Sequence, residues 1–313
     1  MSFLLLLLFC PVHLHADELE NRREAASLIS AYVANVEAIE TFDLLWRCEE
    51  QKLGDDGATG ETVSYGRLMV DTKRGRCCGV MKRMGNETDS GKDGAASRSH
   101  AFLSAVIGDG VQTWYRYHLP AKANRLTDIG ISGALARIDG VYVQGIGFVG
   151  FPLSYYQTND IRTHVEYLRR GAISLELAEG LGNTQVFSFE LKFSGPLKMR
   201  RSFVFDRMTF TPVGLRESTL SGDRTVSEYK ESYAFKSLDG IYVPITIAGN
   251  KHQRTKVGES AVHREVIYDV QLRWFSVNKP LDDKYFDIHI LQDDKVIADL
   301  VSAKLLETPD RDD

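Results

Sequence analysis

The sequence predicts a mainly β protein: one large, curved antiparallel sheet forming an unclosed half-barrel, with an N-terminal helix and short covering helices. Three observations support this fold class. A segment near the N-terminus has the 3.6-residue apolar period of a helix, and most of the chain after it alternates with period two. Large aromatic residues recur on one face of the alternating segments. A sheet that curls encloses such a face, so we expect curvature.

The N-terminus indicates export. Residues 3–9 are apolar, and a short segment ending at Ala16 separates them from acidic residues. This arrangement is typical of the core and cleavage region of a secretory signal peptide, although no basic residue precedes the core. We predict cleavage after Ala16, so that residues 1–16 are a signal peptide and the mature protein lies in the periplasm or cell envelope. An alternative is lipidation at Cys10, because the residues before it resemble a bacterial lipobox.

Residues 17–41 are predicted to form an amphipathic helix that packs its apolar stripe on a sheet. The period then changes to two, which predicts a meander of strands joined by hairpins. The helix stripe consists of Leu19, Ala26, Ile29, Val33, Val36 and Ile39. The strands of this first train are predicted at 44–49, 63–71, 76–82, 102–107 and 111–117.

The centre of the chain differs in composition. Glycines are frequent around 119–170, which predicts a glycine-rich helical insertion with a short helix over 160–170. These pieces and the N-terminal helix are the expected plug or lid of the half-barrel. No composition break divides the chain, so we predict one domain over 17–306, followed by a disordered tail at 307–313. Strands of a second train are predicted at 173–178, 185–193, 201–206, 214–220, 226–235, 241–247, 265–275 and 295–300.

Three short signals refine the second train. Asp239-Gly240 predicts a tight hairpin, and Pro244 within a strand predicts an edge or a bulge. The tripeptide Asn278-Lys279-Pro280 is expected to end the last long strand, because proline donates no ladder hydrogen bond and restricts the residue before it. In that strand the alternation places Tyr268 and Trp274 on the concave side.

The mature chain keeps Cys48, Cys77 and Cys78. Cys77 and Cys78 would face opposite sides of a strand, so at most one of them shares a face with Cys48. If a further strand lies between, the backbones are about 9.6 Å apart, which is too far for a disulfide. We therefore expect three buried apolar cysteines.

No catalytic constellation or metal-ligand spacing is visible. The histidines are scattered, and neighbouring acidic residues such as Asp282 and Asp283 lie in turns. The net charge of −5 does not favour nucleic acid as a partner, and no second apolar run long enough to span a bilayer occurs. We expect a non-enzymatic protein without a cofactor.

Apolar surface is the distinctive property of the predicted strands. Whether side chains fill the concave interior or leave room for an acyl chain stays open from sequence. The residues expected to line a hydrophobic ligand are Trp46, Phe187, Phe189, Tyr268, Leu272 and Trp274.

Several stretches together resemble the LolA/LolB superfamily of outer-membrane lipoprotein carriers. They are FDLLWRCEE, RGRCCGVMKR, SFVFDRMTFTPVGLRES, SEYKESYAFKSLDGIYVPITI and DVQLRWFSVNKPLDDKYFDIHI. The resemblance implies an unclosed antiparallel barrel whose concave face is covered by helices and carries acyl chains or lipoproteins. This chain is longer than a minimal carrier. In the carriers an arginine holds the lid closed, and Arg47 is the candidate here.

The expected function is therefore that of an exported, non-enzymatic envelope protein that binds a lipid or a lipoprotein acyl chain in a half-barrel cavity. The alternative is a structural or signal-sensing module of the same fold, with a filled core and a protein partner.

Overall fold

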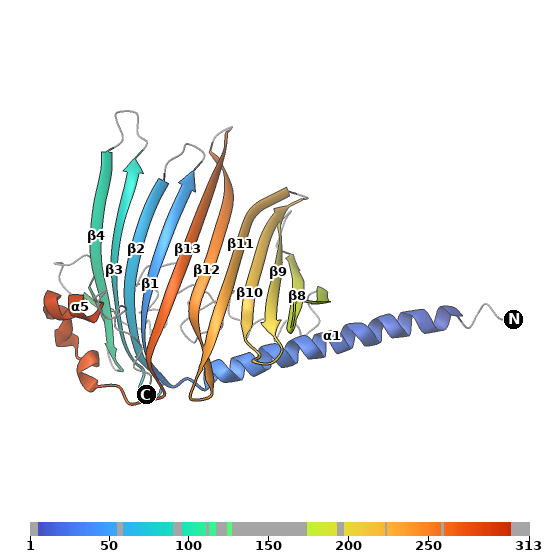
Figure 1. Ribbon diagram of the computed structural model, residues 1–313, viewed down its shortest axis with the longest axis horizontal. Helices are drawn as coiled ribbons and strands as arrows, with labels where there is room; N and C mark the ends of the chain where they lie inside the picture. The colour runs from blue at the N-terminus through green and yellow to red at the C-terminus, as the bar shows by residue number, and fades with distance from the viewer. Residues whose placement is uncertain are drawn as a thin grey trace.

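The computed structural model describes residues 6–54, 59–89, 96–110, 113–116, 124–126, 174–192, 197–222, 224–257 and 260–301. The C-terminal part of a long helix, α1 (Leu6–Glu37), lies beside one end of a large sheet, and its N-terminal part extends beyond the sheet (Figure 1). It begins before the predicted start at residue 17 and ends before residue 41, where the first strand begins. The predictions for the helical insertion at 119–170 and the tail at 307–313 lie outside the described residues, as do the side chains of residues 1–16.

The strands of the described residues form a single sheet in the order β6-β5-β4-β3-β2-β1-β13-β12-β11-β10-β9-β8-β7. Each pairing is antiparallel, and the end strands β6 and β7 are not neighbours, so the predicted unclosed sheet is confirmed. The strands are β1 (Thr41–Gly54), β2 (Thr59–Asp71), β3 (Arg76–Asp89), β4 (Ala96–Asp109), β5 (Thr113–Arg116), β6 (Asn124–Leu126), β7 (Ser174–Glu179), β8 (Thr184–Lys192), β9 (Leu197–Asp206), β10 (Pro212–Ser221), β11 (Arg224–Leu238), β12 (Ile241–Val257) and β13 (Ser260–Val277).

One pairing joins the two strand trains. Elsewhere in the described sheet the neighbours are consecutive strands, but β1 pairs with β13 from the far end of the chain. Their register runs from Phe42 opposite Val277 to Gly54 opposite Arg264. Both trains therefore share one sheet, with β1 and β13 in its middle (Figure 1).

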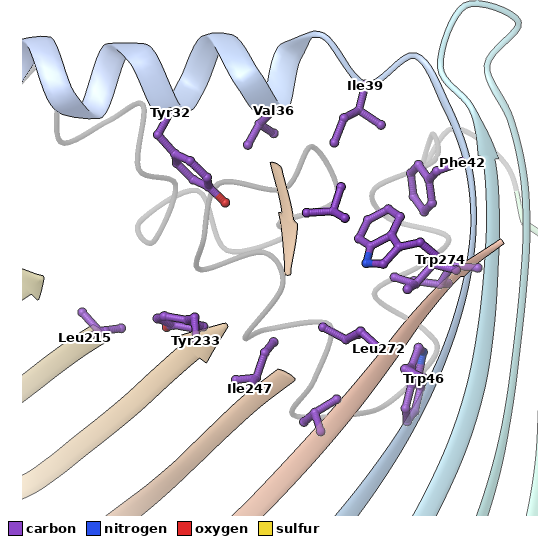
Figure 2. Close-up of a cluster of buried hydrophobic side chains, with 14 of the residues drawn as sticks. Tyr32, Val36, Ile39, Phe42, Trp46, Leu215, Tyr233, Ile247, Leu272 and Trp274 are labelled. Carbon is purple, nitrogen blue, oxygen red and sulfur yellow. The ribbon is translucent and has the colours of Figure 1, made fainter. Parts of the chain in front are cut away.

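The concave face carries the larger hydrophobic core. The stripe of α1 faces this side, and Figure 2 shows Tyr32, Val36 and Ile39 directed toward side chains of the sheet. Of the predicted stripe, Ile29 and Val36 are buried, Ala26 and Val33 are half-buried, and Ile39 is buried just after the helix ends. Ring contacts link the helix to the sheet, because Tyr32 meets Phe205 and Phe235 edge to face, at centroid distances of 6.3 and 6.0 Å.

A second core lies on the opposite face of β2, β3 and β4, and the sequence did not predict it. The chain after β13 forms η2 (Asp283–Phe286), η3 (Ile288–Gln292) and α5 (Asp294–Leu300). Its apolar side chains pack against the strand side chains that point away from α1. This core contains Met69, Cys78, Val80, Ala105, Ile107, Phe286, Leu291, Ile297, Leu300 and Val301.

The strand predicted at 295–300 is therefore wrong, because this segment is the helix α5. The Asp293 side chain accepts hydrogen bonds from the backbone N–H groups of Lys295 and Val296, at 2.9 and 3.2 Å, and so caps the helix N-terminus. Ile297 and Leu300 are three residues apart, so they share a helix face and are both buried.

Two arginines hold the C-terminal segment against the sheet. Arg76 donates to Asp71 at 2.8 Å and to Asp283 at 2.6 Å, and its guanidinium lies 4.3 Å from the Phe286 ring centroid. The Arg67 guanidinium lies 5.4 Å from the Tyr285 ring centroid, within the range of a cation–π interaction. These contacts explain why the segment after Pro280 turns back over the outer face.

The short turn signals are confirmed. Asp239 and Gly240 have φ values of 51° and 83° and connect β11 to β12, as a tight hairpin requires. Pro244 lies in a bulge, because the register of β11 and β12 shifts between Ala234 and Phe235, which is opposite Pro244. The strand that contains Pro244 is interior, so the bulge alternative is correct and the edge alternative is not.

Cys48, Cys77 and Cys78 are buried, and no disulfide joins them. β2 lies between β1 and β3, and Cys77 and Cys78 belong to different cores, as the strand alternation requires. Burial raises the pKa of the Cys77 thiol to about 12, and it also raises the pKa of Cys78. The prediction of buried apolar cysteines is confirmed.

Asn278 connects the helix, β1 and β13. Its Oδ1 accepts from the backbone N–H groups of Glu40 at 2.7 Å and Thr41 at 3.3 Å, and its Nδ2 donates to the Ala38 carbonyl at 2.7 Å. Its own backbone N–H donates to the Thr41 carbonyl at 2.8 Å. Asn278 has a φ of 54°, a conformation that asparagine tolerates better than most residues. It therefore ends β13 and clamps the link from α1 to β1.

Replacing Asn278 with alanine should lower the free energy of unfolding by about 2–4 kcal/mol. Three side-chain hydrogen bonds would be lost, and alanine tolerates the left-handed backbone conformation less well than asparagine. Urea denaturation measures this change. Asn278→Gly keeps the backbone conformation and should recover about 1 kcal/mol of the loss. Lys279→Ala is the control and should change stability by less than about 0.5 kcal/mol. Equal stability of Asn278→Ala and the wild type would contradict the clamp.

Candidate functional site

The structure brings five of the six predicted lining residues into one cluster on the concave face. Trp46, Phe187, Tyr268, Leu272 and Trp274 are all buried there. For the sixth residue, Phe189, only the backbone in β8 is described. Figure 2 shows Trp46, Leu272 and Trp274 on neighbouring strands of this face. The period-two alternation therefore identified the inward side of β1 and β13 correctly.

Trp274 contacts other parts of the protein. Its indole Nε1 donates to the Pro244 carbonyl at 2.6 Å, and its ring packs on Phe42 with a centroid distance of 5.7 Å. The bulge at Pro244 turns this carbonyl toward the indole, so an irregularity of β12 satisfies a buried donor. Phe42, near the start of β1, thereby packs against Trp274 near the end of β13.

Two glycines make room for large rings on the concave face. A Cβ atom at Gly66 would lie 2.1 Å from the Trp46 ring, and one at Gly249 would lie 2.5 Å from Tyr268 Cζ. Each glycine is the cross-strand partner of the aromatic residue that covers it. The rings therefore lie flat along the neighbouring strand.

Tyr268 uses this space to reach a buried carboxylate. Glu231 on β11 is opposite Gly249 on β12, and Gly249 is opposite Tyr268 on β13. Because Gly249 has no side chain, the Tyr268 ring passes over β12 and its hydroxyl donates to Glu231. Tyr233, two residues along β11, also donates to the Glu231 carboxylate. The Tyr268 and Tyr229 hydroxyl oxygens are 2.9 Å apart.

We call Glu231, Tyr229, Tyr233 and Tyr268 the tyrosine–glutamate cluster. Burial raises the pKa of Glu231, although the tyrosine hydrogen bonds oppose this effect. Burial also raises the pKa of each of the three tyrosines, and the negative charge of Glu231 adds to this effect. The tyrosines therefore stay protonated and act as donors at neutral pH.

Sequence reasoning missed this cluster. Tyr229, Glu231 and Tyr233 alternate along one strand, so an acidic residue between two tyrosines on the concave face was the available signal. The contribution of Tyr268 depends on the pairing of β12 with β13. Arg47, the candidate lid arginine, alternates with the inward residues of β1, and its guanidinium pairs with Glu49.

Within the described residues, no group of three or more histidine, cysteine, aspartate or glutamate side chains is placed to hold a metal ion. The helices of the same part of the chain include none that is long and apolar enough to cross a membrane.

No protein-family model matches the sequence, and no curated protein matches it as a relative. Among solved structures, the chain is similar to a domain from Vibrio parahaemolyticus that is provisionally named an outer membrane lipoprotein-sorting protein. The identity is 12%, the TM-score is 0.37, and the match covers 85% of this chain and 98% of that one.

Two further solved structures are similar. A DUF1329 family protein from Desulfovibrio piger is 10% identical with a TM-score of 0.37, covering 85% of this chain and 98% of that one. A LolA superfamily protein from Nitrosomonas europaea is 14% identical with a TM-score of 0.32, covering 82% and 96%. All three TM-scores are below 0.5.

Replacing Gly249 with alanine should push Tyr268 away from Glu231 and lower the free energy of unfolding by about 1–3 kcal/mol, because the new Cβ has no space. Urea denaturation measures the loss. In a Tyr268→Ala background the same change should cost less, because the ring is gone. Gly214→Ala is the control, since its Cβ would lie at an ordinary 3.5 Å from Val204. Equal costs in both backgrounds would contradict the contact.

The stability of the protein should depend on pH through Glu231. A carboxyl group whose pKa is raised by folding binds its proton more tightly in the folded state, so it contributes stability at low pH that is lost as pH rises above the usual value of 4.5. Glu231→Gln removes this dependence. We therefore expect the free energy of unfolding of Glu231→Gln, relative to wild type, to increase between pH 4 and pH 7. A relative stability that falls over this range would contradict the raised pKa.

Proposed function

We propose that this chain is an exported, non-enzymatic envelope protein that binds a hydrophobic ligand, a lipid or a lipoprotein acyl chain, at the concave face of its half-barrel. The observation that carries the proposal is the extent of the buried apolar layer on that face. It runs from Trp46 on β1 across β13, β12 and β11 to Leu215 on β10, and α1 lies along it (Figure 2). The apolar N-terminal run supports export.

Binding would be driven by burial of the ligand chain. Each CH₂ group removed from water contributes about 0.8 kcal/mol, so one acyl chain supplies most of the required free energy. The ligand would lie between the strands and the stripe of α1, where rings such as Tyr32 and Trp274 already exclude water. The resemblance of the strand motifs to the lipoprotein-carrier superfamily is consistent with this mode of binding.

A second candidate function is a structural or signal-sensing module with a filled core and a protein partner. The packing of Trp274 favours it, because the contacts of this indole are made to Phe42 and to the Pro244 carbonyl. The two candidates differ in whether acyl chains reach the rings of the concave face.

Tryptophan quenching by a brominated monoacylglycerol tests the first candidate. We expect quenching in two variants that each keep a single tryptophan, one at Trp46 and one at Trp274, with phenylalanine at the other tryptophan positions. The control carries Phe275→Trp as its single tryptophan, on the outer face of β13, and should not be quenched. Native mass spectrometry of protein purified from the envelope should show a bound lipid.

Ligand-free protein together with unquenched emission at both inner positions would contradict lipid binding and favour the filled core. Equal quenching at position 275 would show that the probe coats the whole surface, which would also contradict a concave site.

A further inference from the structure

Glu231 differs from the other buried carboxylates of the described residues. Asp43 accepts from Arg67 at 2.9 and 2.7 Å, and Asp71 accepts from Arg76 at 2.8 Å. Glu50 has Lys52 and Arg83 within salt-bridge distance, at 3.6 and 3.7 Å. The groups that act on Glu231 are three tyrosines, which carry no positive charge. In the described part of the chain, Glu231 is thus the buried carboxylate that lacks a cation.

A buried carboxylate without a cation is costly, because it loses its hydration and gains no opposite charge. The strands nevertheless leave space for this carboxyl group and its tyrosine partners. Gly249 clears the path of Tyr268, and the tyrosines on either side of Glu231 occupy the same face of β11. The result is one carboxyl group, 5% exposed, within a predominantly apolar layer of side chains.

The surroundings of Glu231 suit an organic cation. Tyrosine rings attract cations through their negative faces, and an ammonium group among aromatic rings is a recurrent recognition mode. Tyrosine hydroxyl oxygens can accept hydrogen bonds while they donate to the carboxylate. An anionic headgroup would instead meet the charge of Glu231 at close range, in a medium that screens it weakly.

We infer that the tyrosine–glutamate cluster is the headgroup subsite of the concave face, and that it selects amphiphiles whose polar end is an alkylammonium group. The apolar chain of such a ligand would lie along the surface formed by Leu215, Ile247 and Leu272, and its ammonium group would supply the missing cation of Glu231. This inference deepens the proposed function and depends on it.

Calorimetric titration with four probes, three of which share a dodecyl chain and are used below the concentrations at which they aggregate, tests the inference. The probes are dodecyltrimethylammonium, dodecanol, dodecanoate and the chain-free tetramethylammonium. The wild type should bind dodecyltrimethylammonium at least about tenfold more tightly than dodecanoate, because one probe pairs with the buried charge and the other is repelled. Dodecanol should fall between them, and tetramethylammonium should bind most weakly.

Glu231→Gln keeps the shape of the side chain and should abolish the preference for the ammonium probe over dodecanoate while dodecanol still binds. Tyr229→Phe removes one hydroxyl group but keeps the ring, so it should retain most of the preference. Glu228→Gln is the matched control, because Glu228 lies on the opposite face of the same strand and pairs with Arg216. It should keep the wild-type preference.

The outcomes separate this inference from the proposed function. If no dodecyl probe binds the wild type, the proposed function fails, and the inference fails with it. If all three dodecyl probes bind equally, and Glu231→Gln binds them in the same way, lipid binding stands and the headgroup subsite is refuted. Tetramethylammonium binding as tight as that of dodecyltrimethylammonium would show a site for a free cation and would refute an amphiphile subsite.

Discussion

The pairing of β1 with β13 is the constraint on which the rest of the structure depends. It joins a strand that follows the N-terminal helix to the last strand of the described residues, and it places both in the middle of the sheet. Closing so long a loop costs conformational entropy, which the long register of buried partners and the Asn278 clamp offset. Without this pairing, the two hairpin trains would be separate sheets, and neither would present the full concave face.

The same pairing decides which residues meet on the concave face. Trp46 comes from β1. Trp274 and Tyr268 both come from β13, the strand that joins β1 to the second train. From β13, Tyr268 reaches Glu231 because Gly249 leaves the intervening strand without a side chain. Three strands thus place a polar group within the apolar layer. β11 contributes the carboxyl group of Glu231, β12 contributes the space above Gly249, and β13 contributes the hydroxyl group of Tyr268.

Strand alternation made much of this predictable. Period-two patterns are local, so they located most strands and separated Tyr268, Leu272 and Trp274 from their outward neighbours. The strand prediction at 295–300 was wrong because its six residues fit both the period of a strand and the period of a helix, and the N-cap Asp293 favours the helix. The second core was missed for a related reason: alternation indicates that a face is apolar, but not that a later segment returns to cover it.

By itself, the sequence determined the fold class, the inward side of the strands, the hairpin at Asp239-Gly240 and the end of β13 at Asn278, because each depends on neighbouring residues. Only the tertiary structure decided that β1 lies beside β13, that α5 covers the outer face, and that tyrosines enclose Glu231. These features depend on contacts between residues far apart in the chain. Their free energy comes from burial and pairing across strands, which no local pattern of residues encodes.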